Sequence, residues 1–191
     1  MRRMQRGSGM EIKTVGIVGA GQMGNGIAHV FALAGFDVQM SDISEEALER
    51  ARALIGRNLE RQVSRGKISE ADKAATLARI STTTRLADIG PSDLIIEAAT
   101  ERETVKNAIF EDLQPHLKPE TILTSNTSSI SITRLASRTD RPERFMGLHF
   151  MNPVPVMQLV ELIRGIATDD ATYETMLKVV ERIGKTAASA E

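Results

Sequence analysis

Two polar side chains occupy otherwise apolar stretches in the second half of the chain. His149 stands in Gly-Leu-His-Phe-Met, and Glu161 stands in Leu-Val-Glu-Leu-Ile. A carboxylate in an apolar strand needs a partner, because an unpaired buried charge is costly. A carboxylate that holds a histidine fixes its tautomer and stabilises the imidazolium, as a general acid and base requires. We therefore predict that adjacent strands pair His149 with Glu161. A histidine satisfied within the core is the alternative.

A glycine-rich segment near the start of the chain is suited to binding a dinucleotide. Gly19, Gly21 and Gly24 form a Gly-x-Gly-x-x-Gly motif between a β-branched run and a helix-compatible segment. The first glycine permits a tight turn, the second lets the backbone approach a pyrophosphate, and the third allows close helix–strand packing. The helix N-terminus then offers unpaired N–H groups to phosphates. A structural glycine turn without a ligand is the alternative.

An acidic residue follows the motif at the expected distance. Asp42 ends the next apolar run, 18 residues after Gly24 (42 − 24). A carboxylate there accepts hydrogen bonds from the ribose hydroxyls of adenosine and repels a 2′-phosphate. The next residues, Ile43 and Ser44, provide no arginine for such a phosphate, so the pattern favours NAD over NADP. An acid at a helix start is the alternative interpretation.

Polar residues also follow a later apolar strand, in Ser-Asn-Thr-Ser-Ser at 125–129. In doubly wound sheets, ligands bind outside the carboxyl ends of the strands. Ser128 is either a hydroxyl that contacts a ligand or the cap of a helix that begins near Ile130, and the sequence leaves both open. No Gly-x-Ser-x-Gly elbow surrounds it, so a serine nucleophile is not expected. His29, in an apolar helix, and His116, in a polar loop, have no predicted role.

Composition excludes several other functions. The 191 residues carry a net charge of −1, which gives no basic surface for nucleic acid or membranes. Aromatic residues are 3% with no Trp, so a base-stacking platform is not available. Cysteine is absent and the three histidines are scattered, so we expect no metal site. No apolar run is long enough to span a membrane, and a cytoplasmic location is expected.

The order of elements must bring these residues to one edge of a sheet. A strand at 12–18, the glycine turn, a helix to Ala34 and a strand at 36–40 form the first unit of a parallel sheet. Further strands are predicted at 93–99, 121–125, 145–150, 156–162 and 185–190, with helices at 102–117, 130–137 and 170–183. The pattern predicts an α/β fold with a doubly wound, mostly parallel Rossmann-type sheet.

Two consecutive helices interrupt this alternation. Ser44 is predicted to cap a helix that ends at Gly66, and Ser69, with Asp72 as its capping-box partner, begins a helix through Ile80. Without a strand between them, they should form an inserted helical hairpin at 44–80. Residues 1–9 read as a disordered leader or an added segment, which leaves 10–191 as one domain.

Taken together, these segments resemble the 3-hydroxyacyl-CoA dehydrogenase family, especially its bacterial 3-hydroxybutyryl-CoA dehydrogenase branch. The resemblance runs from about Ile12 to Ala190. It is carried by Gly-Ala-Gly-Gln-Met-Gly at 19–24, Glu-Ala-Ala at 97–99, the segment 125–129, and above all His-Phe-Met-Asn-Pro-Val-Pro-Val-Met at 149–157 with Val-Glu at 160–161.

The resemblance implies roles for individual residues. His149 is the catalytic acid and base, Glu161 orients it, and Ser128 binds the 3-oxygen of the substrate. NAD is the implied cofactor, and the residues implied to bind it are Gly19, Gly21, Gln22, Met23, Gly24, Asp42, Glu101, Lys106, Asn126 and Asn152. The helical hairpin is similar to a CoA-binding arm, with Asn58, Arg65 and the helper Lys67. Some relatives have Ser and Lys where this chain has Asn58 and Arg65. Because Arg also binds phosphate well, the replacement is compatible with CoA binding.

The implied reaction interconverts (S)-3-hydroxyacyl-CoA, most simply 3-hydroxybutyryl-CoA, and 3-ketoacyl-CoA in fatty acid or butanoate metabolism. Family members continue into a helical C-terminal domain that supplies substrate and cofactor contacts and a homodimer interface. We therefore expect this chain to be the nucleotide-binding domain, with apolar surface exposed near 183–190. The alternatives are a dinucleotide-binding module without catalysis, another Rossmann dehydrogenase, and a fragment of a multifunctional fatty-acid oxidation protein.

Overall fold

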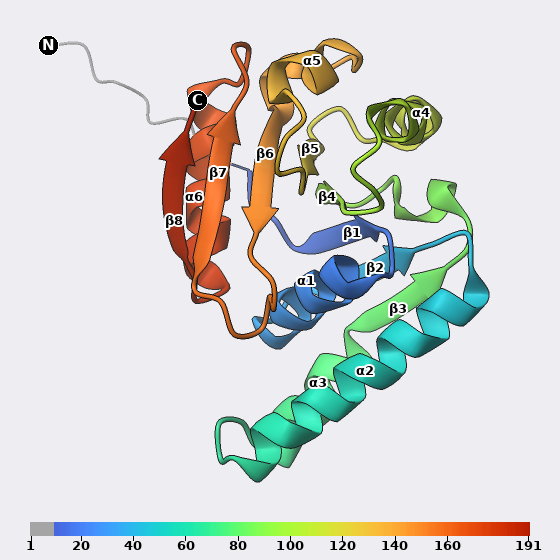
Figure 1. The fold of residues 1–191 in the computed structure, drawn as a ribbon, viewed down its shortest axis with the longest axis vertical. Helices are drawn as coiled ribbons and strands as arrows, with labels where there is room; N and C mark the ends of the chain where they lie inside the picture. Colours follow the sequence, from blue (N-terminus) through green and yellow to red (C-terminus); the bar gives the residue numbers. More distant parts are fainter. Residues whose placement is uncertain (1–9) are drawn as a thin grey trace, which may run out of the picture.

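A single mixed sheet determines where the predicted residues meet (Figure 1). The computed structural model describes residues 10–191, so the expectation for residues 1–9 lies outside the described residues. Within 10–191, the sheet has the strand order β3-β2-β1-β4-β5-β6-β7-β8. The strands are β1 (Thr14–Val18), β2 (Asp37–Ser41), β3 (Ile80–Thr83), β4 (Leu94–Glu97), β5 (Ile122–Ser125), β6 (Phe145–Phe150), β7 (Leu159–Arg164) and β8 (Thr186–Ala190). The helices are α1 (Gln22–Leu33), α2 (Glu45–Ser64), α3 (Glu70–Ala78), α4 (Glu103–Leu113), α5 (Ile132–Ser137) and α6 (Asp170–Arg182).

The sheet reverses its order next to the glycine turn. Strands β1 to β6 run parallel, whereas β7 is antiparallel to β6 and β8 is parallel to β7. Strand β1 pairs with β2 on one side and with β4 on the other, which makes the β1/β4 boundary the topological switch point. Ligands of such sheets bind outside the carboxyl ends of the strands at that point. The predicted doubly wound, mostly parallel Rossmann-type α/β fold is confirmed.

Apolar side chains bury both faces of the sheet. One cluster packs Val15 and Ile17 of β1 against helices α1 and α6, and Phe31 contributes its ring to this cluster. A second cluster on the opposite face packs Ile95 of β4 against helices α4 and α5, with Phe110 at its centre. Parallel strands buried on both faces read as continuous apolar runs, which is why the sequence revealed them.

Helices α2 and α3 lie side by side and project beyond the sheet as an arm (Figure 1). The Ser44 hydroxyl caps α2 by accepting from the Ala47 N–H at 3.1 Å. Ser69 and Asp72 form the predicted capping box of α3. Gly66 has φ of +69° between the helices, a conformation that favours glycine. The inserted hairpin is therefore present.

The predicted end of that hairpin is wrong. Helix α3 stops at Ala78, and Ile80 begins strand β3, which pairs with β2 at the outer edge of the sheet. The residues 80–84 are Ile-Ser-Thr-Thr-Thr, and their β-branched side chains favour a strand over a helix. The apolar spacing that extended the helix to Ile80 instead marks a buried strand residue.

Other boundaries also differ from the prediction, and three of them have a local cause or follow from a cap. Strand β7 begins at Leu159 and not at 156, because the N–H groups of Val156 and Met157 donate to the Pro153 carbonyl and form a turn. Helix α4 ends at Leu113 and a 3-10 turn at Gln114–His116 follows, since Pro115 cannot continue the helical ladder. Helix α5 begins at 132, two residues later than predicted.

The predicted apolar surface near 183–190 is wrong in its location. Ile183 packs against the core, and β8 exposes only small side chains. The most exposed large apolar side chains on this half of the molecule lie in the loops before and after β7, where Val156 is 75% and Ile166 is 90% exposed. Strand β8 instead pairs with β7 from Leu159 onward.

Candidate active site at the carboxyl ends of the strands

The glycine turn between β1 and α1 is tightly enclosed on one side and open on the other. Gly19 has φ of +103°, and its N–H donates to the Ser41 carbonyl at 2.7 Å. A Cβ on Gly24 would lie 1.9 Å from the Gly19 carbonyl oxygen, so only glycine fits there. A Cβ on Gly21 would meet nothing within 4 Å. Backbone crowding explains the outer glycines, and open space at the middle one leaves room for a pyrophosphate.

The N-terminus of α1 faces this open space without a side-chain cap. The first N–H groups of a helix have no intrahelical acceptor, so they are available to an anion. Gln22 is exposed and its Nε2 donates to Asn152 Oδ1 at 3.1 Å, which links the glycine turn to the segment after β6. Met23 is half-buried and packs against the core.

Asp42 holds the backbone on both sides of the turn. Its Oδ2 accepts from the Ala20 N–H and its Oδ1 accepts from the Ser44 N–H, each at 2.9 Å. Ser44, and not Asp42, is the cap of α2. A carboxylate has about four lone-pair sites, so two remain for ligand hydroxyls. The side chain is half-buried beside the glycine turn, as a ribose-binding acid requires.

His149 and Glu161 lie opposite each other on neighbouring strands. The antiparallel register of β6 and β7 pairs these two residues directly. His149 Nδ1 lies 3.1 Å from Glu161 Oε2, and the side chains are 20% and 39% exposed. Within residues 10–191, the Nε2 atom of His149 has no hydrogen-bond partner. The imidazole is thus held at one nitrogen while the other is available for proton transfer.

The segment 125–129 buries the hydroxyls of Ser125 and Thr127 and exposes Ser128 and Ser129. The Ser129 hydroxyl donates to Glu101 Oε2 at 3.3 Å. Thr127 is buried, donates to Glu101 Oε2 at 2.9 Å and accepts from the Ile130 N–H at 3.0 Å. Ser128 is exposed and makes no hydrogen bond with the described residues. The cap of α5 is Ser131, whose hydroxyl accepts from the Arg134 N–H at 3.2 Å. The interpretation of Ser128 as a helix cap is therefore wrong, and a free hydroxyl remains.

An ion pair lies directly beneath this edge of the sheet. Glu97 and Lys106 are 0% and 1% exposed, with Nζ 2.5 Å from Oε1. The same carboxylate accepts from the Ser125 hydroxyl at 2.7 Å and the Ala99 N–H at 2.8 Å. Lys106 was implied as a cofactor contact, and the structure places its ammonium inside, bound to Glu97. Glu101 is exposed at the edge itself.

The arm places the remaining candidates away from the strand ends. Asn58 is half-buried along α2, whereas Arg65 and Lys67 are exposed at the turn between α2 and α3. The candidate residues therefore form two separate groups, one at the edge of the sheet and one on the arm. The edge group comprises the glycine turn, Asp42, Glu101, Asn126, Ser128, His149, Asn152 and Glu161.

Comparison with known proteins decides the family. Residues 14–191 match the description "3-hydroxyacyl-CoA dehydrogenase, NAD binding domain". This chain belongs to the 3-hydroxyacyl-CoA dehydrogenase family. It is 58% identical over 180 residues to 3-hydroxybutyryl-CoA dehydrogenase of Bradyrhizobium diazoefficiens, covering 94% of this chain and 61% of that protein. A crystal structure of (S)-3-hydroxybutyryl-CoA dehydrogenase from Ralstonia eutropha has a TM-score of 0.91 at 47% identity, covering 94% and 63% of the two chains.

A second solved structure gives the same fold. The 3-hydroxybutyryl-CoA dehydrogenase of Escherichia coli superposes with a TM-score of 0.92 at 43% identity, covering 94% of this chain and 38% of that one. The chain spans about three fifths of the length of three curated relatives: 61%, 62% and 62%. The matched part is the NAD-binding domain of the family, so NAD is the cofactor that this fold binds.

The geometry also places residues at the candidate site that the sequence did not single out. A hollow of about 480 Å³ lies between the glycine turn and helix α2, and its lining includes Arg50 and Arg57. The structural role of Glu97 was missed too. The signal for Glu97 was present, since an acid ends the apolar run Leu-Ile-Ile-Glu just as His149 interrupts its own strand. The two arginines gave no signal, because charged residues on an exposed helix are ordinary.

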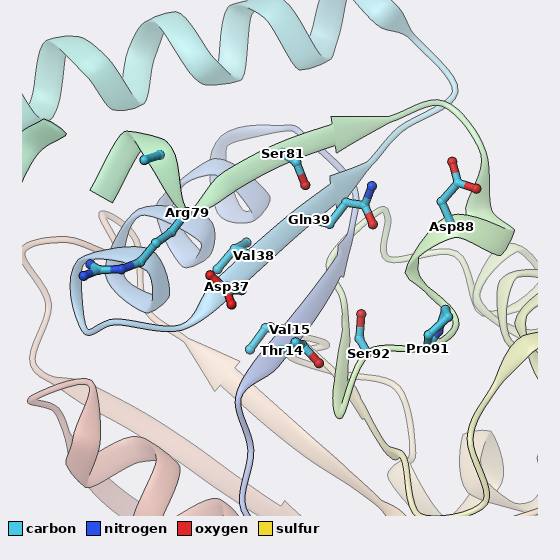
Figure 2. Close-up of a pocket in the computed structure, with 11 residues that line it drawn as sticks. Thr14, Val15, Asp37, Val38, Gln39, Arg79, Ser81, Asp88, Pro91 and Ser92 are labelled. Atoms are coloured by element: carbon cyan, nitrogen blue, oxygen red, sulfur yellow. The ribbon is translucent and has the colours of Figure 1, made fainter. Parts of the chain in front are cut away.

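A separate hollow lies away from the candidate site of this dehydrogenase domain. It has a volume of about 400 Å³ and is lined by Thr14, Gln39, Ser81 and Asp88 among others, from strands β1 to β3 and the turn after β3 (Figure 2). None of the predicted site residues lines it. Among residues 10–191, no three His, Cys, Asp or Glu side chains gather in a metal-binding arrangement. No helix in that range is long and apolar enough to cross a membrane.

Proposed function

We propose that this chain is the cofactor-binding and acid–base part of an NAD-dependent dehydrogenase that interconverts (S)-3-hydroxyacyl-CoA and 3-ketoacyl-CoA. The observation that carries the proposal is the His149–Glu161 pair, with 3.1 Å between Nδ1 and Oε2, at the sheet edge that also carries the glycine turn. An acid–base group and a dinucleotide turn at one edge suit the oxidation of an alcohol. The names of similar proteins support 3-hydroxybutyryl-CoA as the substrate.

In the proposed reaction, the alcohol at C3 of the substrate is oxidised to a ketone, and residues of this chain take up the hydroxyl proton. NAD, when bound, supplies the hydride acceptor. His149 Nε2 takes the proton from the 3-hydroxyl, and Glu161 stabilises the imidazolium that forms. Ser128 donates its free hydroxyl to the 3-oxygen and orients the C–O bond. In the reverse direction His149 returns the proton to the 3-oxygen.

The cofactor and the CoA moiety are held by different parts of the chain. The glycine turn and the N-terminus of α1 bind the pyrophosphate, and Asp42 binds the adenosine ribose. Glu101, Asn126 and Asn152 are the candidates for the nicotinamide half, whereas Lys106 is buried against Glu97 and supports this edge from beneath. Arg65 and Lys67 on the arm offer exposed cationic groups to the phosphates of CoA, beside Asn58. We also propose that the whole protein forms a homodimer through a further domain.

A dinucleotide-binding module without catalysis is the second candidate function. The observation in its favour is that the chain spans 61% of the Bradyrhizobium relative, so residues that complete the substrate pocket can lie elsewhere. It shares the glycine turn and Asp42 with the first proposal. It differs in predicting that bound cofactor does not react.

Two measurements on this chain separate the candidates. The first is a titration with NADH, followed by the change in its nicotinamide fluorescence on binding. The second is loss of NADH absorbance after addition of acetoacetyl-CoA. Binding with oxidation of NADH supports the dehydrogenase. Binding without oxidation supports the module, and no binding contradicts both. A faster reaction with a CoA-free keto acid contradicts the CoA-dependent reaction.

A further inference from the structure

Strand β6 extends beyond its neighbour β5 at the end that carries His149. Strand β5 pairs with β6 from Leu123↔Phe145 to Ser125↔Gly147 and then ends. On its other side, β6 continues to pair with β7 as far as Phe150. The last three residues of β6 therefore have a strand partner on the β7 side only. A backbone N–H that faces the vacant side needs another acceptor, since buried amides are paired almost without exception.

The side chain of Asn126 supplies that acceptor. Its Oδ1 accepts from the Phe150 N–H at 2.8 Å, and the residue is 8% exposed. Its own backbone N–H donates to the Glu97 carbonyl at 2.9 Å. Asn126 thus ties the end of β6 to β4, across the point where β5 has stopped. The bond lies one residue from His149, on the opposite side of β6 from Glu161.

We propose that Asn126 is a positioning residue, which holds the His149 end of β6 against β4, the neighbour of the strand β1 that leads into the glycine turn. This inference rests on the proposed acid–base role of His149. The atom that matters is the acceptor Oδ1, whereas a direct cofactor contact through the amide would use the donor Nδ2. Within residues 10–191, Nδ2 has no hydrogen-bond partner. Proton transfer needs heavy atoms within about 2.6–3.2 Å, so a small shift of this strand end slows the reaction strongly.

The test compares Asn126→Ala, which removes donor and acceptor, with Asn126→Asp, which keeps the acceptor and removes the donor. Asn107→Ala is the matched control, because Asn107 lies on α4 and, among residues 10–191, forms no side-chain hydrogen bond with β6. The first readout is hydrogen exchange of the Phe150 amide. We expect Asn126→Ala to lower its protection by about tenfold relative to the core of β1, the size of one backbone hydrogen bond. Asn126→Asp and Asn107→Ala should retain the parent protection.

The second readout is steady-state kinetics in a form of the protein that reduces acetoacetyl-CoA. Asn126→Ala should lower kcat by about 10- to 100-fold while KM for NADH stays within about twofold, because the reacting groups are displaced and the cofactor turn is not. Asn126→Asp should restore most of kcat. A loss in the Asp variant equal to that in the Ala variant would indicate a donor role and overturn the proposal.

The exchange measurement requires no turnover, so it remains informative if the proposed reaction is absent. Unchanged Phe150 protection in Asn126→Ala overturns the positioning role even where the chain is an active dehydrogenase. If Asn126→Ala lowers Phe150 protection but the parent protein has no activity, the positioning role stands and the proposed function is contradicted. Should Asn126→Ala fail to fold, exchange in Asn126→Asp decides: parent-like protection supports the acceptor role, and a tenfold loss overturns it.

Discussion

Residues at the strand ends are of two kinds: those that face a ligand, and those that hold the ligand-facing residues in place. His149 belongs to the first group because its Nδ1 is held by Glu161, while its Nε2 has no hydrogen-bond partner among residues 10–191. Replacing His149 by Gln should lower kcat by about 10²- to 10⁴-fold, the usual contribution of an acid–base group. The NADH dissociation constant should be unchanged. Stopped-flow reduction of acetoacetyl-CoA measures the first and fluorescence titration the second.

The control for this variant is His116→Gln, since His116 is exposed in a 3-10 turn on another part of the chain. It should behave like the parent in both assays. A His149→Gln variant that keeps more than about a tenth of the parent kcat would contradict the acid–base role.

Glu97 belongs to the second group, because it is buried and holds Lys106, Ser125 and the Ala99 N–H. Breaking a buried pair leaves the other charge without compensation, which costs about 3–5 kcal/mol. We predict a loss of that size in the free energy of unfolding for Glu97→Gln, measured by urea denaturation. The double variant Glu97→Gln/Lys106→Met should recover part of the loss. If the double variant is no more stable than the single one, the cost comes from lost packing and not from an unpaired charge.

At the scale of elements, the arm is fastened to the body by a buried polar contact. His29 of α1 is 1% exposed, and its Nε2 lies 3.0 Å from Gln62 Oε1 of α2. Burial lowers the pKa of His29 below its ordinary value of 6.5, and the nearby Lys185 charge lowers it further, against a smaller opposing effect of the Gln62 hydrogen bond. The folded chain therefore binds a proton at His29 less readily than the unfolded chain.

This difference predicts how stability depends on pH. Above the unfolded value of 6.5, both states keep His29 neutral and its full contribution is present. As the pH falls below that value, the unfolded state gains the proton first, and stability is lost until the folded pKa is reached. The urea midpoint should be lower at about pH 5.5 than at about pH 7.5. His29→Gln should flatten this part of the profile, and an unchanged slope would show that other groups cause it.

The sequence predicted most elements because their apolar periodicity and caps are local properties. Strand β3 was missed because a four-residue edge strand after a helix has no periodicity of its own, and its pairing with β2 is a tertiary effect. The start of β7 was misplaced because Val-Pro-Val-Met reads as an extended apolar run. Only the structure shows that the Pro153 carbonyl accepts two backbone hydrogen bonds, which make this segment a turn.

At the scale of the whole molecule, the site could be predicted where a polar side chain interrupts an apolar strand. His149 and Glu161 each interrupt an apolar strand, and the structure places them opposite each other. The contact of Asn126 with β6 was beyond the sequence, because it depends on which strand ends first. For Glu97 the sequence shows an acid at the end of an apolar run, but not the buried groups that this acid holds. Lengths of neighbouring strands are set by the assembled sheet, and local pattern does not encode them.

We predict that cofactor choice is a property of the assembled molecule, because the Asp42 carboxylate, which also holds the backbone at Ala20 and Ser44, should repel a 2′-phosphate. A ligand at one hundred times its dissociation constant stabilises the folded state by about 2.7 kcal/mol. For a chain of this size, that raises Tm by about 5–10 °C. We predict this shift with NADH and a shift smaller by at least half with NADPH at the same concentration.

Asp42→Ser should reduce the difference between the two cofactors, since the repelling charge is removed while the hydroxyl still accepts a backbone hydrogen bond. Thermal unfolding followed by circular dichroism, with each cofactor and with neither, measures the shifts. The parent Tm without ligand serves as the reference for each variant, because Asp42 also supports the glycine turn. Equal shifts with NADH and NADPH in the parent chain would contradict the preference for NAD. An unchanged preference in Asp42→Ser would place its origin in another residue.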